Sequence, residues 1–383
     1  MARFQYLTQI EIDAGAVRLL AQECRRAGMQ KPLIVSDAGV KAAGVLNQAL
    51  AALGDLPHAV FDQTPGNPTE AAVRAATTVY RAQGCDGLVA VGGGSSIDLA
   101  KGVAIAATHP GPLAQYATIE GGADRITAAA APVIAVPTTA GTGSEVARGT
   151  ILIVDDGRKL GFHNWHLLPR VALLDPELTR GLPPGLTAAT GMDAIAHCLE
   201  TFMGHAVNPP ADGVALDGLR RGWAHIERAT RDGATDLEAR WQMMSASMQG
   251  ALAFQKGLGC VHSLSHALGG VDPRLHHGTL NAVFLPAVIR FNAEAESMRR
   301  EHRIERIAQA MGLPGSDPQG VAVADAIRAM NVRLGLPTGL GQMGVDRGQF
   351  ERVISGALVD HCHRTNPRLA SRDDYLALLD ASW

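Results

Sequence analysis

The sequence predicts an α/β domain followed by an all-helical domain, and three observations support this division. Short apolar runs that read as buried strands occur at residues 31–36, 87–91 and 132–137. Stretches with helical periodicity separate them, and this alternation is typical of a mostly parallel sheet covered by helices. From about Thr187 no strand-like run appears. We therefore place the boundary at the Pro183-Pro184 turn and predict domains over residues 1–184 and 185–383.

The first domain is predicted to alternate strands and helices in a regular order. A strand ending at Gly15 opens the chain, and the turn at residues 65–68 is followed by Thr69, a favourable N-cap for a helix of roughly sixteen residues. The other strands are expected at residues 31–36, 58–62, 87–91 and 132–137, and the other helices at residues 17–27, 40–53 and from 97 onward.

Length and composition exclude several classes of protein. With 383 residues, 46% hydrophobic and 19% charged, the chain is expected to form two globular domains. A net charge of −3 leaves no electrostatic footprint for nucleic acid. The chain has no apolar run of about 18 residues, which a membrane span would require. Five cysteines without a CxxC pair, and no pattern of a signal peptide at the start, predict reduced thiols and a cytoplasmic location.

A glycine-rich loop follows the predicted strand at residues 87–91. It reads Gly92-Gly93-Gly94-Ser95-Ser96 and leads directly into a helix. Glycine lets the backbone approach a ligand closely, and the exposed N–H groups of a helix N-terminus favour a phosphate. The alternative is a tight strand-to-helix turn, which glycine also serves. The loop is neither a GxGxxG fingerprint nor a Walker loop, because no Lys-Ser/Thr pair follows the glycines.

Two further loops are expected beside the glycine-rich loop. Hydroxyl groups of Thr138, Thr139 and Thr142 follow the predicted strand at residues 132–137. Ligands of open α/β sheets gather beyond the carboxyl ends of the strands, so these loops are expected to face one crevice in a Rossmann-like, dinucleotide-binding domain. Asp37, at the end of an earlier strand, is placed to accept hydrogen bonds from ribose hydroxyls and to repel the 2′-phosphate of NADP. The alternative for Asp37 is an ordinary exposed loop carboxylate.

A dense set of histidines marks the predicted helical domain. His262, His266, His276 and His277 lie within sixteen residues, and Gly269-Gly270 with Pro273 are expected to break the helix between the two pairs. Upstream, Asp193 and His197 are four residues apart, so they share one face of a helix whose other residues are apolar. One Asp and three His suit Fe(II) or Zn(II) with room for a substrate oxygen. The alternative is a set of satisfied polar side chains beneath a loop. An HExxH signature of metalloproteases is absent.

Six motifs in this order resemble the iron-containing (group III) alcohol dehydrogenases, and the resemblance covers essentially the whole chain. They are GGGSSIDLAK at residues 92–101, PTTAGTGSE at 137–145, LLDPELTRGLPP at 173–184, ATGMDAIAHCLE at 189–200, VHSLSHALGG at 261–270 and HHGTLNAVFLP at 276–286. The resemblance implies a dehydroquinate synthase-like architecture, an NAD cofactor between the domains, one Fe(2+) with Zn(2+) as the alternative, and a homodimer or larger homo-oligomer.

Site residues follow from the resemblance position by position. The family's metal ligands fall on Asp193, His197, His262 and His277, the last chosen over His276 because it begins the pattern His-Gly-Thr-Leu-Asn. The family's histidine close to the nicotinamide and substrate falls on His266, which we predict to be catalytic. With Gly93 and Thr142 from the loops described above, the predicted cofactor-binding residues are Asp37, Asn67, Gly93, Gly94, Ser95, Asp98, Thr138, Thr139, Thr142, Lys159, Leu178 and Thr179.

The resemblance predicts reversible hydride transfer between NAD and a small-molecule alcohol, either a primary or secondary alcohol or a hydroxy acid, which becomes an aldehyde or ketone. Two alternatives keep the fold: a reductase of an oxo-acid such as maleylacetate, and a metal- and NAD-dependent lyase of the dehydroquinate synthase type. A nucleotide-binding regulatory module without turnover would leave the Asp and His set unexplained. No nucleic-acid or membrane partner is expected.

Overall fold

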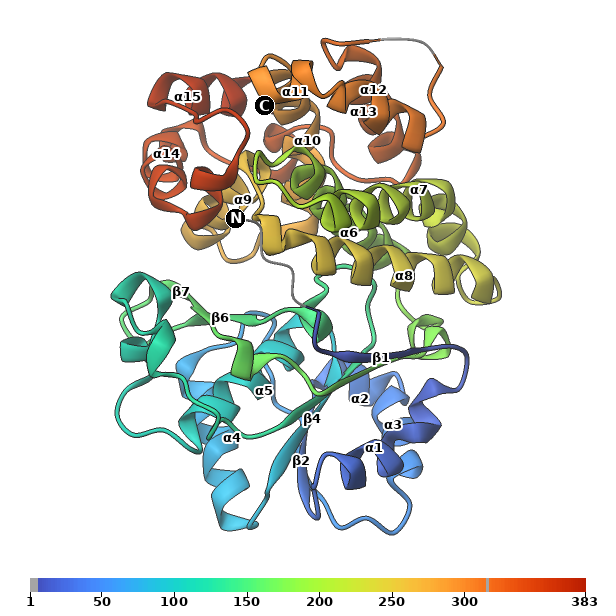
Figure 1. Cartoon of the computed structure of the whole chain (residues 1–383), viewed down its shortest axis with the longest axis vertical. Coiled ribbons are helices and arrows are strands. Elements are labelled where there is room, and N and C mark those ends of the chain that lie inside the picture. The colour runs from blue at the N-terminus through green and yellow to red at the C-terminus, as the bar shows by residue number, and fades with distance from the viewer. Residues whose placement is uncertain (1–5, 315–316) are drawn as a thin grey trace. The chain divides into compact units, whose positions relative to one another are not determined.

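The computed structural model of the chain describes residues 6–314 and 317–383. These residues divide into two compact units, Tyr6–Gly181 and Leu182–Trp383 (Figure 1). The first unit is built on a parallel sheet, and the described secondary-structure elements of the second are all helices. The predicted fold class, a parallel α/β domain followed by an all-α domain, is therefore confirmed.

Six parallel strands form the sheet of the first unit, in the order β1-β8-β5-β4-β2-β3. Almost every residue of the central strands is buried, which explains why these strands appear in the sequence as continuous apolar runs. The strands are β1 (Gln9–Ile12), β2 (Pro32–Val35), β3 (Ala59–Phe61), β4 (Gly87–Gly92), β5 (Val133–Pro137) and β8 (Val171–Leu174).

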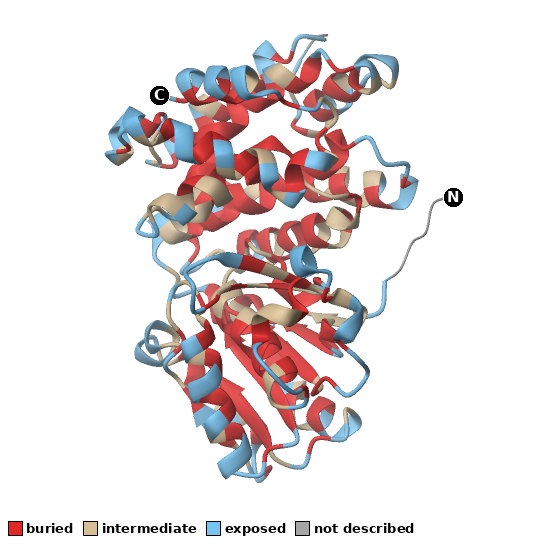
Figure 2. Cartoon of the chain, turned by 90° about the vertical axis from the view of Figure 1, so that its left-hand side faces the viewer, coloured by how far each residue is buried: buried red, intermediate tan, exposed pale blue. Residues whose placement is uncertain are grey.

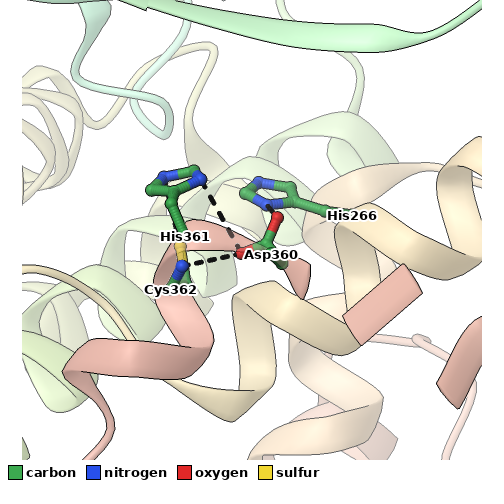
Figure 3. Close-up of side chains that lie close together, drawn as sticks. All are labelled: His266, Asp360, His361 and Cys362. Carbon is green, nitrogen blue, oxygen red and sulfur yellow. Dashed lines mark hydrogen bonds and ion pairs between the residues drawn. The ribbon is translucent and has the colours of Figure 1, made fainter. Parts of the chain in front are cut away.

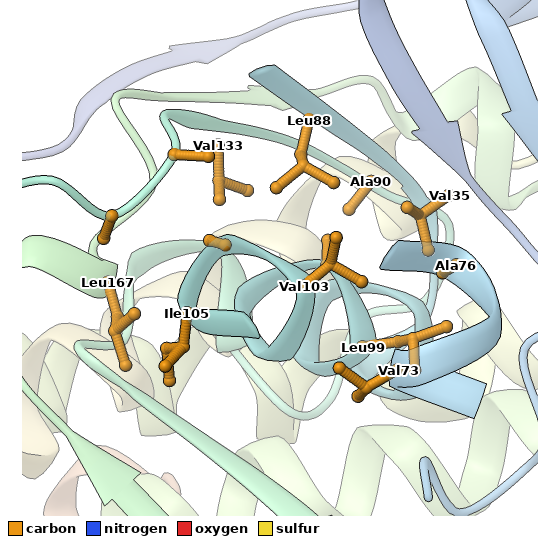
Figure 4. Packing of buried hydrophobic residues seen from close by; sticks show 14 of the residues in the cluster. Val35, Val73, Ala76, Leu88, Ala90, Leu99, Val103, Ile105, Val133 and Leu167 are labelled. Atoms are coloured by element: carbon orange, nitrogen blue, oxygen red, sulfur yellow. The ribbon is translucent and has the colours of Figure 1, made fainter. Parts of the chain in front are cut away.

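Helices cover both faces of the sheet because alternate residues of each strand point to opposite faces. Leu88 and Ala90 of β4 face α4 (Glu70–Ala82) and α5 (Gly94–Ala106), as Figure 4 shows for the packing around Val103. Val89 and Val91 belong to the apolar cluster on the opposite face. That face is covered by α1 (Leu20–Arg26) and α3 (Val45–Leu53), whereas the short α2 (Ala38–Ala42) follows β2. Each fully buried Leu or Val side chain of β4 contributes about 1.5–3 kcal/mol relative to an exposed one.

The structure corrects several element predictions. The helix expected over residues 40–53 is two helices, α2 and α3, because Gly44 between them has a φ of 74°. A two-stranded antiparallel hairpin, β6 (Gly149–Ile153) and β7 (Lys159–His163), was not predicted. The first strand ends at Ile12 rather than Gly15, and residues 1–5 of that prediction lie outside the described residues.

Helix α6 (Pro184–Met203) is the centre of the second unit, and every residue from Thr187 to Met203 is buried. It packs against α7, α8 and α10. Figure 2 shows that the helices bury their inner faces and leave the outer faces exposed. None of the described helices is long and apolar enough to cross a membrane. The remaining helices are α7 (Pro209–Asp232), α8 (Leu237–Ala253), α9 (Cys260–Val271), α10 (His277–Ala293), α11 (Glu296–Arg300), α12 (Arg303–Ala310), α13 (Val321–Arg333), α14 (Phe350–Val359) and α15 (Arg372–Ala381).

A buried lysine holds the loop that leads from β5 to β6. Lys101 of α5 is fully buried, and its Nζ donates to the carbonyl oxygens of Ser144, Ala147 and Gly149 at 2.7–2.8 Å. Glu145 lies in the same loop and is 3% exposed. Burial raises the pKa of Glu145 to about 7, although the charge of Lys101 acts in the opposite direction. The folded protein therefore holds a proton on Glu145 that the unfolded chain releases at lower pH.

Glu145→Gln tests this assignment. An unfolded glutamate ionises near pH 4.5, and the folded one near pH 7, so wild-type stability is lost as the pH rises through this window. A pKa shift of this size corresponds to roughly 3 kcal/mol. Between pH 5 and pH 8, the free energy of unfolding of the variant should therefore rise by about that much relative to that of wild type. Urea unfolding at both pH values measures it. Glu120→Gln, at an exposed position of the same unit, is the control, and an equal response of the two variants would contradict the assignment.

Candidate functional site

Helix α6 presents a carboxylate and an imidazole in a buried setting. Asp193 and His197 lie one helical turn apart, so both side chains leave the same face. Their residues are 2% and 4% exposed, respectively, and the neighbouring helix residues are apolar. His197 Nε2 lies 3.7 Å from Asp193 Oδ1.

Two other helices add one imidazole each. His262 comes from α9, and His277 is the first residue of α10. The Nε2 atom of each lies 3.7 Å from the same Asp193 Oδ1 that His197 approaches. The structure thus brings together the four predicted ligands, whereas His276 is the exposed N-cap of α10. The predicted helix break between the two histidine pairs is present, but it begins after Val271 rather than at Gly269-Gly270.

The outer nitrogens of two of these rings have partners that turn Nε2 inward. His262 Nδ1 bonds to the carboxylate of Glu200, which also accepts a hydrogen bond from the Val261 amide at 2.7 Å. His277 Nδ1 lies 3.2 Å from Ser265 Oγ. A carboxylate behind a ligating histidine sets the ring orientation and makes the imidazole a stronger donor to a metal. Glu200, whose side chain is fully buried, is therefore a positioning residue.

Asn281 shows that this donor set fits a cation. Its side-chain nitrogen donates to Asp193 Oδ1 at 2.7 Å and lies 3.3 Å and 3.2 Å from Nε2 of His262 and His277. Its Oδ1 is buried and has no hydrogen-bond partner among the described residues. The Asn281 amide group therefore lies where one carboxylate oxygen and two imidazole nitrogens converge, as they would on a cation. Two ligands bound tetrahedrally at about 2.0–2.2 Å lie roughly 3.4 Å apart, close to the separations observed here.

The charges of the group favour a bound cation. Burial alone would raise the pKa of Asp193, but the three neighbouring histidines outweigh it and hold that pKa below the ordinary value. Burial lowers the pKa of His262, and the carboxylates of Glu200 and Asp193 more than reverse this effect. Positive charge at the centre of the group is therefore stabilised by the surrounding carboxylates.

A glycine lets α10 approach α6 closely enough to form the group. A Cβ atom on Gly278 would lie 2.2 Å from the carbonyl oxygen of Ala189 and 3.3 Å from Asp193 Cβ. Backbone cannot yield as a flexible side chain can, so a larger residue at this position would separate the two helices. The His277-Gly278 pair therefore combines a ligand with the close contact that positions it.

His266 lies beside this group without joining it. Its ring stacks on His277 with centroids 5.3 Å apart and meets His262 edge-on at 5.6 Å. Its Nδ1 lies 3.0 Å from Oδ2 of Asp360. Burial raises the pKa of Asp360, but the adjacent His266 more than offsets this and holds it below the ordinary value. The Asp360 carboxylate thus engages Nδ1 and leaves Nε2 of His266 available to exchange a proton.

In the first unit, the predicted nucleotide loops follow three neighbouring strands, in the order β5-β4-β2. The chain leaves β2 toward β3 and leaves β4 toward β5 on the other side, so a topological switch point lies between β2 and β4. Gly93 is the N-cap of α5, so no side chain caps the start of this helix. A Cβ atom on Gly94 would lie 2.7 Å from Thr142 Cγ2. The glycine-rich loop is therefore packed against the threonine-rich loop, as expected.

The other predicted cofactor positions surround these loops. Asp37 caps α2 through the Val40 amide and accepts a hydrogen bond from Ser96 Oγ at 3.2 Å. Lys159 Nζ donates to Asn67 Oδ1 at 3.2 Å. Ser95 donates to Gly66 O, and Asp98 accepts from Ser144 Oγ and the Ile151 amide. After β5, Thr138 is buried and Thr139 is half-buried, and Leu178 and Thr179 are buried in the turn after β8.

Comparison with known proteins assigns this chain to a family. Residues 8–176 match the family described as iron-containing alcohol dehydrogenase, and residues 187–383 match the C-terminal domain of the same family. The chain belongs to the iron-containing alcohol dehydrogenases. The predicted family is therefore confirmed, and with it the prediction of an NAD-dependent alcohol dehydrogenase, an oxidoreductase that requires a metal.

Three relatives place the chain within the family. It is 67% identical to the 4-hydroxybutyrate dehydrogenase of Cupriavidus necator, over 100% of both chains. It is 36% identical to the 1,3-propanediol dehydrogenase of Klebsiella pneumoniae, covering 95% of this chain and 94% of that one. The solved structure of a 1,3-propanediol oxidoreductase superposes with a TM-score of 0.93 at 34% identity, with 100% of each chain covered.

Sequence reasoning missed the residues that orient the histidines of this alcohol dehydrogenase. Glu200 closes the predicted motif at residues 189–200, and Asn281 lies in the one at residues 276–286, but neither was assigned a role. Asp360 lies outside all six motifs. A buried glutamate two turns after Asp193 on an apolar helix was the available signal for Glu200, because a charged residue there needs a partner.

Gly278→Ala should disrupt the approach of α10 to α6. Because the added methyl group overlaps the Ala189 carbonyl, we expect a loss of about 1–3 kcal/mol in unfolding free energy and weaker metal binding. Gly270→Ala is the matched control, since no atom lies within 4 Å of its added Cβ and alanine favours α9 by up to about 1 kcal/mol. Thermal unfolding and cobalt titration of both variants measure the effects. Equal behaviour would contradict the close-contact explanation.

Glu200→Gln should weaken metal binding while the fold is retained. The amide keeps the shape of the side chain but removes the charge behind His262, and loss of such a partner lowers metal affinity about 10–100-fold. Zinc affinity is measured by competition with a chromophoric chelator. Glu296→Gln, with a side chain 87% exposed, serves as the control. An unchanged zinc affinity in the Glu200→Gln variant would contradict a role of this carboxylate in metal binding.

Proposed function

We propose that the chain oxidises 4-hydroxybutyrate, or a closely related ω-hydroxycarboxylate, to the corresponding aldehyde acid with NAD, and catalyses the reverse reduction. The observation that carries this proposal is the 67% identity to a 4-hydroxybutyrate dehydrogenase over the full length of both chains. The other family relatives described above are named for 1,3-propanediol, which also carries a terminal hydroxyl on a short chain. A short, terminally hydroxylated substrate is therefore proposed.

In this proposal Asp193, His197, His262 and His277 hold Fe(2+), with Zn(2+) as the alternative because both ions accept this ligand set. When bound, the ion supplies the Lewis acidity that favours loss of the alcohol proton, and NAD supplies the hydride acceptor. The common 3.7 Å separation of the three Nε2 atoms from Asp193 Oδ1 supports the ligand assignment. Glu200 holds the His262 ring in the orientation that this assignment needs.

His266 is proposed to move the alcohol proton. Its ring lies against His277, one side chain away from the proposed ion. Because Asp360 engages Nδ1, Nε2 is the atom that accepts the proton during oxidation and returns it during reduction. Asp360 is accordingly a positioning residue, since it fixes the tautomer and orientation of the catalytic ring without touching the reacting atoms.

Residues 1–184 are proposed to bind NAD, and residues 185–383 to bind the metal and substrate. The helix N-terminus at Gly93 and Gly94 is suited to the pyrophosphate, and Asp37 to the ribose hydroxyls. The remaining proposed contacts are Asn67, Ser95, Asp98, Thr138, Thr139, Thr142, Lys159, Leu178 and Thr179. A homodimer or larger homo-oligomer in the cytoplasm completes the proposal.

The deciding experiment compares substrates on anaerobically iron-loaded protein. NADH formation is measured with 4-hydroxybutyrate, 1,3-propanediol and 1-butanol, with NADP as the alternative cofactor. We expect kcat/KM for 4-hydroxybutyrate to exceed that for 1-butanol by at least about tenfold. 1-Butanol lacks the carboxylate, so the polar groups of the enzyme that bind this carboxylate would have no partner. Asp193→Ala should lower turnover on the order of 100-fold or more, since Lewis-acid stabilisation is worth several kcal/mol.

Three results would count against the proposal. A preference for 1-butanol would reject the hydroxycarboxylate. If maleylacetate is reduced by NADH and none of the alcohols is oxidised, the oxo-acid reductase would be favoured. Full activity of Asp193→Ala would reject the proposed metal site, whichever substrate is used.

A further inference from the structure

A second group of ligand-type side chains lies next to the proposed catalytic histidine. His266 comes from α9, and Asp360 follows the end of α14, where it caps the short 3-10 helix η11 (His361–Thr365). His361 and Cys362 are the first two residues of that turn. One ligand atom from each of the four side chains lies within 4.8 Å of the others, and Figure 3 shows them gathered around Asp360.

The contacts within this group already link all four residues. Asp360 Oδ2 lies 3.0 Å from His266 Nδ1, and Oδ1 accepts the Cys362 amide at 2.8 Å. His361 Nδ1 is 3.8 Å from Asp360 Oδ1, and its Nε2 is 3.4 Å from Cys362 Sγ. The two histidine rings stack with centroids 5.8 Å apart. A carboxylate oxygen, two imidazole nitrogens and a sulfur atom thus surround one small volume.

We propose that His266, Asp360, His361 and Cys362 form a second divalent-cation site, with a preference for zinc. Thiolate and imidazole ligands select Zn(II), and a Cys, His and Asp set is typical of four-coordinate zinc. Binding deprotonates Cys362 and releases one proton to solvent, because the thiolate is the ligand. The proton on Nδ1 of His266 moves to Nε2 of the same neutral ring as Nδ1 becomes a ligand. No electron is transferred.

The pair formed by His266 and Asp360 requires only a small adjustment, whereas the wider separations within the group, all within 4.8 Å, must close. Zinc bonds of about 2.0–2.2 Å to nitrogen and oxygen place tetrahedral ligands roughly 3.4 Å apart. The His266–Asp360 distance of 3.0 Å must therefore open by a few tenths of an ångström as the hydrogen bond is replaced. Cys362 is buried, whereas the His361 side chain is 57% exposed and offers an ion an entry path from solvent.

The first group, around Asp193, and the second site, around Asp360, both contact His266 but differ in their ligand types. His266 stacks on His277 of the first group and on His361 of the second, so an ion in the second site lies close to the first. The first group contains no sulfur. Zinc at the second site would take Nδ1 of His266 from Asp360, and we expect it to inhibit turnover. This consequence, unlike the binding itself, rests on the proposed function of His266.

Cobalt substitution tests the binding directly on the full chain. Co(II) bound to a thiolate gives a sulfur-to-metal charge-transfer band in the near ultraviolet, which the first group cannot produce. Metal-free protein should bind two equivalents of Co(II) and develop this band. Cys362→Ser should lose the band and one equivalent, and Asp193→Ala should keep the band while losing the other equivalent. His361→Ala, at an exposed position, should weaken binding of the cobalt equivalent that gives the band at least about tenfold.

Two outcomes would overturn the second site: uptake of a single equivalent without the band by wild type, or persistence of the band in Cys362→Ser. Inhibition is tested separately on iron-loaded enzyme with added zinc. Wild type should lose activity, whereas Cys362→Ser, which leaves the proposed catalytic and first-site residues intact, should retain it. Equal inhibition of both would overturn the second site as the cause, without bearing on the substrate experiment above.

Discussion

The buried carboxylate of Asp193 is the constraint that organises the helical unit. An ionised carboxylate in an apolar interior is costly unless positive charge or hydrogen bonds surround it. Helix α6 can place only His197 beside it, one turn away. The remaining partners must come from α9 and α10, so these helices have to approach α6 closely. The glycine at position 278 makes that approach compatible with backbone packing.

Orientation of the imidazoles depends on a second layer of polar groups. His262 is held by Glu200 across 62 residues of sequence, and His266 is held by Asp360 across 94. In both pairs the carboxylate engages Nδ1, so Nε2 lies on the opposite side of the imidazole ring. The same arrangement serves two purposes in the proposed mechanism: behind His262 it strengthens a metal ligand, and behind His266 it prepares a proton carrier.

In the proposed function the α/β unit has a different task, which is to provide positive electrostatic potential for an anionic cofactor. Backbone N–H groups at the start of α5 supply that potential, and the tight contact of Gly94 with Thr142 brings two strand-end loops together. Lys101 is used instead inside the unit, where it pairs with loop carbonyls. A charged residue within a family motif can therefore be structural, while the neighbouring glycines are the proposed ligand contacts.

The sequence alone determined the fold class and the family, and it predicted the Asp and His residues that the structure brings together on three helices. Buried parallel strands are continuous apolar runs, and Asp193 and His197 share a face by helical spacing alone, so both can be read locally. Only the tertiary structure decided which atoms meet. Glu200 and Asp360 are positioned by packing between segments far apart in the chain. Local sequence patterns such as helical periodicity carry no information about these contacts. The same packing lets α9 run through Gly269-Gly270, where local propensity predicted a break, and brings His361 and Cys362 beside His266.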